Sequence, residues 1–349
     1  MLLSSLAECV YWFGRYIERT ENTARMILVN DSLLLDVPHH CNPGWAPIIH
    51  ITGSAPDFYR HYDNASEHNV VRYLVLDGDN NPGAMINSVA SARENLRSAR
   101  ALFPKPLWEV VNDLYSYLQD NSSAVMSHKR RYRFLRRVID DCHLIAGKLA
   151  ATMSHDDIYE FMRIGFNLER ADMTSRVIDV RAENLLKTSA DGLQPFDDIQ
   201  WKSVLDSLAA WQMYRRCVHV RISGEEVLRY LLKDGHFPRA IYHCLDQLEQ
   251  SLYALAVTDY PRTALLEARR RVRHVKIDSI VGDGLHRFID ELQLLFADIH
   301  NELSCHYFGS QKIAAVNAAD KPTPIESAVD QKQSLQEDDV GVHGTMHAG

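Results

Sequence analysis

The sequence predicts an all-α protein built from two similar helical halves and followed by a disordered tail. Three observations support this fold class: a repeated segment, apolar residues at helical spacing through most of the chain, and a change of composition after residue 310. Apolar residues make up 46% of the chain and charged residues 24%, a balance that allows a substantial core. We therefore expect a helical bundle body over 1–310 and an acidic tail over 311–349.

The repeated segment covers twelve residues and combines an apolar frame with a fixed set of charges. Segment 14–25 returns 151 residues later as segment 165–176, with the same glycine, Glu-Arg pair, threonine and final arginine. Weaker matches follow in the same order, for example 72–78 against 229–235. A repeat of this length indicates a duplicated folded half rather than a solenoid unit. We predict tandem halves over 1–153 and 154–310, related by a pseudo-twofold rotation.

Both copies of the repeat fall on a long helix. Apolar or small residues step by three and four from Leu6 to Ile27, and again from Phe161 to Ile178, which is the pattern of one buried stripe. Alanine, serine and threonine within both stripes allow another helix to approach closely. We therefore expect the two long helices to pack against each other as antiparallel neighbours.

Further helices are predicted wherever the same periodicity recurs. Pro82 and Pro238 each stand before such a run and are predicted to occupy its first turn, where a proline loses no needed donor. Segment 36–57 contains four prolines and is predicted to be the least regular part of the body. No convincing set of alternating strands is present. The predicted helical runs are 83–102, 106–119, 128–153, 198–219, 224–234, 238–256, 262–275 and 285–308.

Charge and cysteine usage indicate what kind of protein this is and where it works. The tail holds six acids against three lysines, so it supplies −3 of the net charge of −8, and its scarcity of large apolar residues predicts disorder. The body is then only mildly acidic, which argues against general nucleic-acid binding. Six scattered cysteines without a Cys-x-x-Cys pair, no signal peptide and no apolar run of membrane-spanning length predict a cytoplasmic protein.

The charges of the repeat form the main candidate site. On a helix, Glu18, Asn22 and Arg25 lie within about 60° of one another, beside the apolar stripe. The second copy places Glu169 and Arg176 at the equivalent positions. The candidate ligand-binding residues are Arg15, Glu18, Arg19, Asn22, Arg25, Glu169, Arg170 and Arg176.

Three interpretations of these charges stay open. In the first, each glutamate pairs with an arginine of a packed helix and fixes the register of the pair. In the second, paired arginines at the pseudo-twofold interface bind a carboxylate or a phosphate. In the third, Glu18 and Glu169 act as general acid and base, although no nucleophile and no metal-binding set accompanies them.

Other candidates are less specific. The run His39-His40-Cys41 resembles metal ligands, but an exposed loop is the commoner explanation of such a run. His286, at the start of the last helix, is predicted to cap or pack rather than to act as a base. The basic runs 129–133 and 269–273 are predicted to be helical faces that lie in solvent or dock on an acidic protein.

Taken together, these residues resemble the bacterial alpha-E family, an all-helical domain named for a repeated Glu-Arg motif. The family's second motif usually reads Gly-Arg where this chain has Gly165-Phe166, which departs from a symmetric pair of arginine sites. The resemblance covers roughly 1–308. It rests on 11–25, Asn81-Pro82, Ala92-Arg93-Glu94-Asn95, 108–112, 168–174, Phe237-Pro238-Arg239 and Gly284-Leu285-His286.

The resemblance implies a helper role. Members of the family are encoded beside, or fused to, a circularly permuted ATP-grasp amide ligase, often together with a transglutaminase-like protease. We therefore expect a non-catalytic partner or a peptide-binding module in a peptide synthesis or tagging pathway, with no cofactor of its own. Basic faces near Arg131 or Arg271 are predicted to contribute to ligase binding. An enzyme acting on a peptide or amide through the Glu-Arg helices, and a plain structural scaffold, are the alternatives.

Overall fold

The computed structural model describes residues 4–37, 43–188, 194–218, 221–255, 262–280 and 283–308. These residues contain helices and no strand, which confirms the all-α class. The chain divides into Met1–Ser310 and Gln311–Gly349, and the predicted tail lies outside the described residues. Among the described helices, none combines the length and the apolarity that crossing a membrane requires.

The first half is built around its first helix, α1 (Ser4–Asp36), whose 33 residues include the first copy of the repeat. Helices α5 and α8 both pack against α1, and α6 packs against α5 and α8. The elements that follow α1 are α2 (Ala46–Ile51), α3 (Ala55–His61), α4 (Glu67–Val75), α5 (Met85–Ser98), the 3-10 helix η2 (Arg100–Leu102), α6 (Lys105–Asp120), α7 (Ser122–Met126) and α8 (His128–Thr152).

The rest of the body is built around α9 (Asp157–Thr188), which has 32 residues and carries the second copy of the repeat. Helices α13 and α16 pack against α9, and α14 packs against α13 and α16. A rotation that superposes the two halves stays a prediction. The remaining helices are α10 (Gln194–Ser207), α11 (Trp211–Cys217), α12 (Gly224–Lys233), α13 (Ile241–Ala254), α14 (Thr263–His274), α15 (Ile277–Ile280) and α16 (Asp283–Tyr307).

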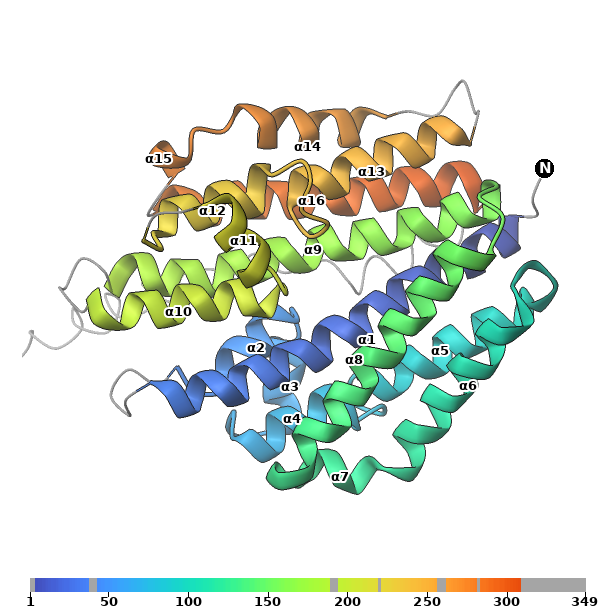
Figure 1. Cartoon of the computed structure of the whole chain (residues 1–349), viewed down its shortest axis with the longest axis horizontal. Helices are drawn as coiled ribbons and strands as arrows, with labels where there is room; N and C mark the ends of the chain where they lie inside the picture. Colours follow the sequence, from blue (N-terminus) through green and yellow to red (C-terminus); the bar gives the residue numbers. More distant parts are fainter. Residues whose placement is uncertain are drawn as a thin grey trace, which may run out of the picture. The chain divides into compact units, whose positions relative to one another are not determined.

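Helices α1 and α9 lie side by side and run in the same direction, so the expected antiparallel arrangement is wrong (Figure 1). Their contacts advance together along both helices, because Gly165 lies against Tyr11 and Arg170 pairs with Glu18. The connection explains the direction. Helix α8 returns the chain to the end where α1 begins, and the short turn 153–156 then starts α9 alongside α1.

The glycines of the repeat allow the two helices to approach closely. A Cβ atom on Gly14 would lie 2.5 Å from the carbonyl oxygen of Met162. A Cβ atom on Gly165 would lie even closer to the carbonyl oxygen of Tyr11. Met162 follows Tyr11 by 151 residues, as Gly165 follows Gly14, so the two contacts are equivalent. Backbone meets backbone at this crossing, and no side chain fits between the helices.

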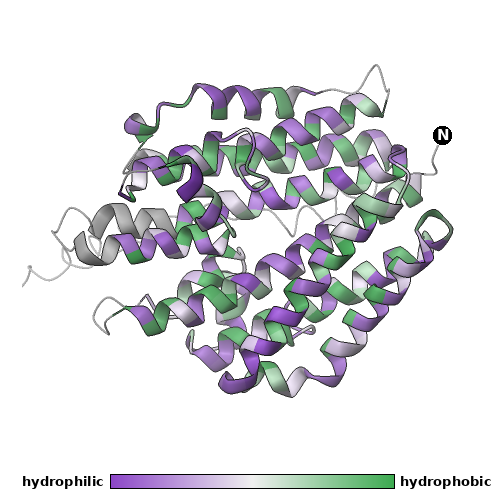
Figure 2. Ribbon diagram, in the orientation of Figure 1, coloured by the Kyte–Doolittle hydropathy of each residue, from purple (hydrophilic) through white to green (hydrophobic). Residues whose placement is uncertain are grey.

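The buried stripes expected on the two long helices are present. Val10, Phe13 and Ile17 of α1 are at most 1% exposed, as are Ile164 and Leu168 of α9. Figure 2 shows hydrophobic and hydrophilic residues alternating around the helices of the body. The apolar faces meet in one continuous core, which holds the charged residues of the repeat at a fixed place beside it.

The predicted helix 198–219 is two helices, because the chain breaks between α10 and α11. Ala209 has a φ of 51°, the left-handed conformation. Its N–H donates to the carbonyl of Asp206 at 3.0 Å, and the N–H of Ala210 donates to the carbonyl of Leu205 at 2.7 Å. These two bonds form a Schellman helix end, at which glycine is the usual residue. Alanine at this position gives no sequence signal for a break.

Replacing Ala209 with glycine should therefore stabilise the protein. The left-handed conformation strains an alanine and not a glycine, so we expect Ala209→Gly to raise the free energy of unfolding by about 0.5–1 kcal/mol. Urea unfolding of the variant beside the wild-type chain measures this difference. A loss of stability would contradict the assigned helix end.

The region predicted to be least regular contains α2 and α3, because prolines in it occupy the first turns of these short helices. The helix α4 was not predicted. Pro82 and Pro238 do not occupy helical first turns. Each is the second residue of a turn, closed by N–H···O bonds of 2.9 Å over 81–84 and 3.0 Å over 237–240. The second of these turns presents Arg239 to the centre of the body.

Candidate functional site

Glu169, in the middle of α9, is buried and held by two arginines of α1. The Nε atom of Arg15 lies 2.7 Å from Oε2 of Glu169, and the Nε atom of Arg19 lies 2.6 Å from Oε1. Burial by itself would raise the pKa of Glu169, but the charges of Arg19 and Arg15 lower it to about 2. Both carboxylate oxygens are therefore occupied by guanidinium donors.

Glu18 makes the reciprocal pair from α1 to α9. Arg170 donates to its two oxygens, from Nη2 at 2.7 Å and from Nε at 3.1 Å. A second guanidinium comes from Arg239, which pairs with Glu18 and also donates from Nη2 to Glu21 at 2.6 Å. Phe166 stands where α1 has Arg15, so α9 has no arginine at that position to make a second pair with Glu18. Arg239 supplies the missing charge from the turn before α13.

Arg25 extends this network toward α10. It pairs with Glu21 and donates to the side-chain oxygen of Asn22, and its Nε donates to the carbonyl of Ser207 at 2.8 Å. That carbonyl belongs to the last turn of α10, where the helix itself leaves carbonyls without partners. His143 of α8 also reaches Glu21, with Nε2 3.2 Å from Oε1. The network thus joins α1, α8, α9, α10 and the turn before α13.

The part of the network around Glu18 carries more positive than negative charge. Within the described part of the chain, it joins the guanidiniums of Arg25, Arg170 and Arg239 to the carboxylates of Glu18 and Glu21. Burial, and then the charge of Arg239, lower the pKa of Arg25 to about 10. A buried cation without a matching anion is costly. One further anion would make this network neutral.

The structure brings seven of the eight predicted site residues into two clusters at the crossing of α1 and α9. Arg15, Arg19 and Glu169 form one cluster. The other cluster contains Glu18, Asn22, Arg25 and Arg170, and it also includes three residues that were not predicted: Glu21, Arg239 and His143. Arg176 lies apart. It pairs with Asp172 of its own helix at 3.0 Å.

Two of the three unpredicted residues stood in matched segments. Glu21 belongs to the repeat and Arg239 to the Phe-Pro-Arg segment, but their spacing gave no sign of contact across 218 residues. His143 had no signal in the sequence.

The pairing with arginines lowers the pKa values of Glu18 and Glu169, and so affects whether either can act as a general acid or base. Burial would raise the pKa of Glu18, but the charges of Arg170 and Arg239 hold it below its ordinary value. Despite burial, the charges of Arg19 and Arg15 lower the pKa of Glu169 to about 2. A general acid or base works best with a pKa near the working pH. The arginines therefore keep both carboxylates ionised, which favours ion pairing and disfavours general acid–base catalysis.

A cavity of about 380 Å³ lies between α1, α8 and α10, where Arg25 ends the network. Glu21 and Arg25 line its buried end, and the exposed Asp36 and Tyr132 line its outer end. Apolar side chains line the stretch between these ends, chiefly Leu28, Val29, Leu33, Ile139 and Ile199. This volume is within the range of small-molecule sites in proteins.

A smaller cavity of about 210 Å³ lies between α8, α9 and α13. Arg170, Arg163, His243 and Gln247 are among its lining residues. Because Arg170 holds Glu18, the same ionic network reaches a cavity at each of its two ends, through Arg25 and through Arg170.

The two basic faces differ from what the sequence suggested. Arg131 is only 1% exposed and donates to Asp31 at 3.0 Å and to Glu67 at 2.6 Å. Its placement on the outer face of α8 is therefore wrong, because it falls on the same buried stripe as Phe134 and Leu135. Arg271 is paired with Glu267 and Glu291. The exposed basic residues of α8 are Lys129, Arg130, Arg133, Arg136 and Arg137.

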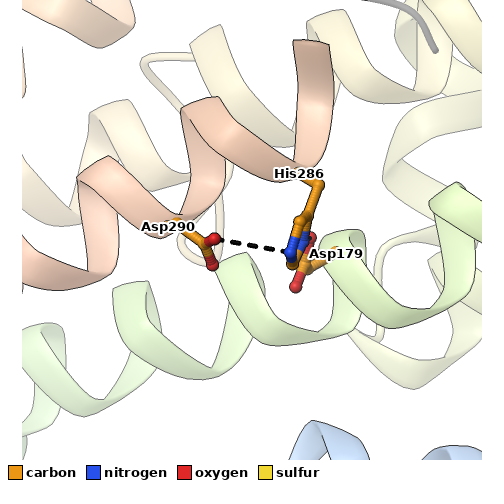
Figure 3. Close-up of side chains that lie close together, drawn as sticks. All are labelled: Asp179, His286 and Asp290. Atoms are coloured by element: carbon orange, nitrogen blue, oxygen red, sulfur yellow. Dashed lines mark hydrogen bonds and ion pairs between the residues drawn. The ribbon is translucent and has the colours of Figure 1, made fainter. Parts of the chain in front are cut away.

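His286 links α16 to α9 through Asp179 and also pairs with Asp290 of its own helix (Figure 3). Its Nδ1 lies 2.8 Å from Asp179 and its Nε2 lies 3.4 Å from Asp290. The pair with Asp179 holds the two helices together. One ligand atom from each of the three residues lies within 4.8 Å of the others, which is the spacing of metal ligands, although exposed acidic groups commonly have this spacing without an ion. The contact with Asp179 is of the packing kind that the sequence predicted for His286.

The cysteine-containing candidates give little further chemistry. The run His39-His40-Cys41 lies outside the described residues, so its prediction is untested. Among the described residues, the cysteines are free thiols: Cys9, Cys142, Cys217, Cys244 and Cys305. Burial raises the pKa of Cys244 to about 12, which disfavours the reactive thiolate.

Tyr11 connects the Glu169 cluster to α16. Its hydroxyl accepts from Nη1 of Arg15 at 3.1 Å and lies 2.9 Å from Nδ1 of His300. Because Arg15 can only donate, the tyrosine hydroxyl donates to Nδ1, which assigns the hydrogen of a neutral His300 to Nε2. Burial, and then the charge of Arg15, lower the pKa of His300 to about 4 from the ordinary 6.5.

This lowered pKa predicts a loss of stability in mild acid. Below pH 6.5 the unfolded chain takes up a proton at this histidine, whereas the folded chain does not until about pH 4. The free energy of unfolding should therefore fall by about 2–3 kcal/mol between these two pH values. Urea unfolding of wild type and of His300→Gln at several pH values tests this. The variant should lose less stability over the same range, and parallel profiles would contradict the assignment.

Comparison with known proteins shows that this chain matches a described family. The model of the Alpha-E family, described as a predicted alpha-helical domain with a conserved ER motif, matches residues 2–308. Uncharacterised proteins of Mycobacterium bovis and Mycobacterium tuberculosis are 21% identical to the chain over 318 residues, covering 84% of it. The match covers 35% of each relative, so the chain spans about a third of their length. No solved structure matches the chain.

Proposed function

Because this chain belongs to the Alpha-E family, with its Glu-Arg motif at Glu18-Arg19 and again at Glu169-Arg170, we propose that it is a non-catalytic, peptide-binding partner of a circularly permuted ATP-grasp amide ligase. The pair would work in the cytoplasm, in a pathway that makes peptides or attaches them to proteins. A transglutaminase-like protease is a further proposed partner.

One observation carries the binding part of this proposal. The glutamates of the motif are ion-paired with arginines on the opposite helix. By contrast, Arg25, at the end of the same network, lines a cavity. The motif therefore fixes the crossing of α1 and α9 and so holds Arg25 in place beside the cavity. Such a division of roles suits a binding module, since the buried charges position a site without reacting.

The lengths of the relatives support the partner part of the proposal. The region similar to this chain is about a third of each mycobacterial protein, so it occurs there as one part of a longer chain. A helical domain that recurs within longer chains is typical of a module that works beside other domains. The described residues contain no strand, whereas the resemblance assigns ATP binding to the ligase.

Co-purification of the full chain with the ATP-grasp ligase encoded beside it tests the partnership. We expect a complex at low and at moderate salt, and faster ATP turnover by the ligase with amino acids when the chain is present. Arg133→Glu, on the exposed basic face of α8, should weaken the complex, whereas Arg60→Glu on α3 serves as the exposed control.

Two results would contradict the proposal. Turnover of a peptide or amide by the chain alone would identify it as an enzyme. Two folded proteins that form no complex at either salt concentration would overturn the ligase partnership.

A further inference from the structure

We infer that the cavity between α1, α8 and α10 binds the C-terminal end of a peptide, with the peptide's terminal carboxylate paired to Arg25. This inference rests on the proposed function, since that function makes a peptide the ligand. It adds which cavity binds the peptide, which end of the peptide enters, and which residue recognises it.

The cavity has a buried end and an exposed end. Along α1 its lining residues step by three and four from Glu21 to Asp36, a distance of about 22 Å at 1.5 Å per residue. His143 of α8 and the last turn of α10 meet α1 at the buried end, beside Glu21 and Arg25. Tyr132 of α8 lies at the exposed end. A ligand that fills the cavity therefore extends from Asp36 to Arg25, and the exposed His143 lies beside the end that Arg25 lines.

The charge at the buried end selects an anion. Three guanidiniums share two carboxylates there, among the residues that the structure describes. Arg25 is the cation of this network that lines the cavity, and its side chain is 8% exposed. A carboxylate bound to Arg25 would neutralise the excess charge in a place that water screens poorly.

Hydrogen-bond donors remain for such an anion. A guanidinium has five N–H groups, and Arg25 uses Nε, Nη1 and Nη2 once each, for Ser207, Glu21 and Asn22. The side-chain oxygen of Asn22 accepts from both Arg25 and Arg239, which fixes the orientation of the amide. Its Nδ2 is buried and has no acceptor among the residues that the structure describes. The network thus has more hydrogen-bond donors than acceptors, and more positive than negative charges.

The rest of the cavity suits an extended chain. Between its ends the walls are apolar, with Leu28 and Val29 on one side and Ile139 on another. A length of about 22 Å exceeds that of an extended tripeptide, which is about 10 Å at about 3.3 Å per residue. Toward the outer end Arg136 and Asp36 provide charges of both signs for the polar groups of a peptide, while Asp206, in the last turn of α10, pairs with Lys202. A small anion would leave the apolar part of the cavity without contact.

Titration calorimetry with three related peptides tests the inference on the full chain. The probes are Ala-Leu-Ala, the same peptide with an acetylated N-terminus, and the same peptide with a C-terminal amide. We expect the first two to bind with similar affinity and the amide to bind at least tenfold more weakly. Equal affinity for the acid and the amide would overturn the inference, and so would the absence of binding by all three to folded protein.

Two variants locate the bound peptide. Arg25→Met should reduce the affinity for Ala-Leu-Ala at least tenfold, but it also alters the buried network. Ser32→Trp closes the exposed end from a surface position and leaves the network untouched, so it should reduce the affinity to the same extent. Ser98→Trp, at an exposed position of α5 that lines neither cavity, is the matched control. Unchanged affinity in Ser32→Trp, with the fold confirmed by circular dichroism, would overturn the inference.

The inference and the proposed function fail in different ways. A ligase complex that forms while the chain binds none of the peptides would overturn the inference alone. Selective binding of the acid peptides without a ligase complex would uphold the inference and overturn the ligase partnership.

Discussion

Gly165→Ala should be among the most destabilising single substitutions in this protein, lowering the free energy of unfolding by about 3 kcal/mol. The added Cβ atom would overlap the carbonyl oxygen of Tyr11, which is backbone inside a helix and cannot move without moving α1. Gly14→Ala should act in the same way through Met162, where the overlap is smaller. Urea unfolding followed by circular dichroism measures both losses.

The control for these glycines lies on α8. Gly147 is exposed within the helix, and a Cβ atom placed on it meets no atom within 4 Å. Alanine favours the helix over glycine, so Gly147→Ala should raise the free energy of unfolding by about 0.5–1 kcal/mol. The same substitution is thus expected to have opposite signs at two helical positions. Equal effects at Gly165 and Gly147 would show that backbone contact does not govern the crossing.

Glu18→Gln is expected to lower the free energy of unfolding by about 3–5 kcal/mol. The glutamine keeps the shape of the side chain but removes one of two carboxylates that balance three guanidiniums, of which those of Arg25 and Arg239 are buried. Glu169→Gln should have a smaller effect, because Arg19 has 28% of its side chain exposed and can be partly hydrated. Thermal and urea unfolding at neutral pH compare the two variants.

A surface ion pair provides the reference for this prediction. Glu94 pairs with Arg97 at 2.7 Å, but half of its side chain is exposed, so Glu94→Gln should change stability by less than about 1 kcal/mol. If Glu18→Gln were as mild as this control, the network would not stabilise the crossing. Loss of peptide binding in such a stable variant would then assign Glu18 to the ligand site.

The sequence was sufficient for features that depend on local periodicity. The stripes on α1 and α9 were predictable because helical spacing alone identifies the face that is buried. That spacing does not say in which direction a partner helix runs, so the parallel crossing was missed. The break at Ala209 was missed because the left-handed conformation is held by the surrounding structure and not by a glycine.

The Glu-Arg motif of the candidate site could be predicted from the sequence, but the further residues that join it could not. The Glu-Arg pairs were found because the repeat placed the same charges at the same helical positions twice. Arg239 joins them from a turn 221 residues beyond Glu18, and only the folded chain shows that contact. The positive excess that motivates a carboxylate ligand depends on Arg239, so it could not be read from the repeat.

The crossing of α1 and α9 also has a consequence for the order of folding. Its partners are about 150 residues apart in the chain, so they meet only after a long loop has closed, whereas the contacts within each half are more local. Until α9 and Arg239 arrive, Glu18 stays hydrated on an incompletely covered helix. Its ion pairs should thus form after the rate-limiting step. Substitutions at Glu18 should then mainly accelerate unfolding and leave the folding rate almost unchanged.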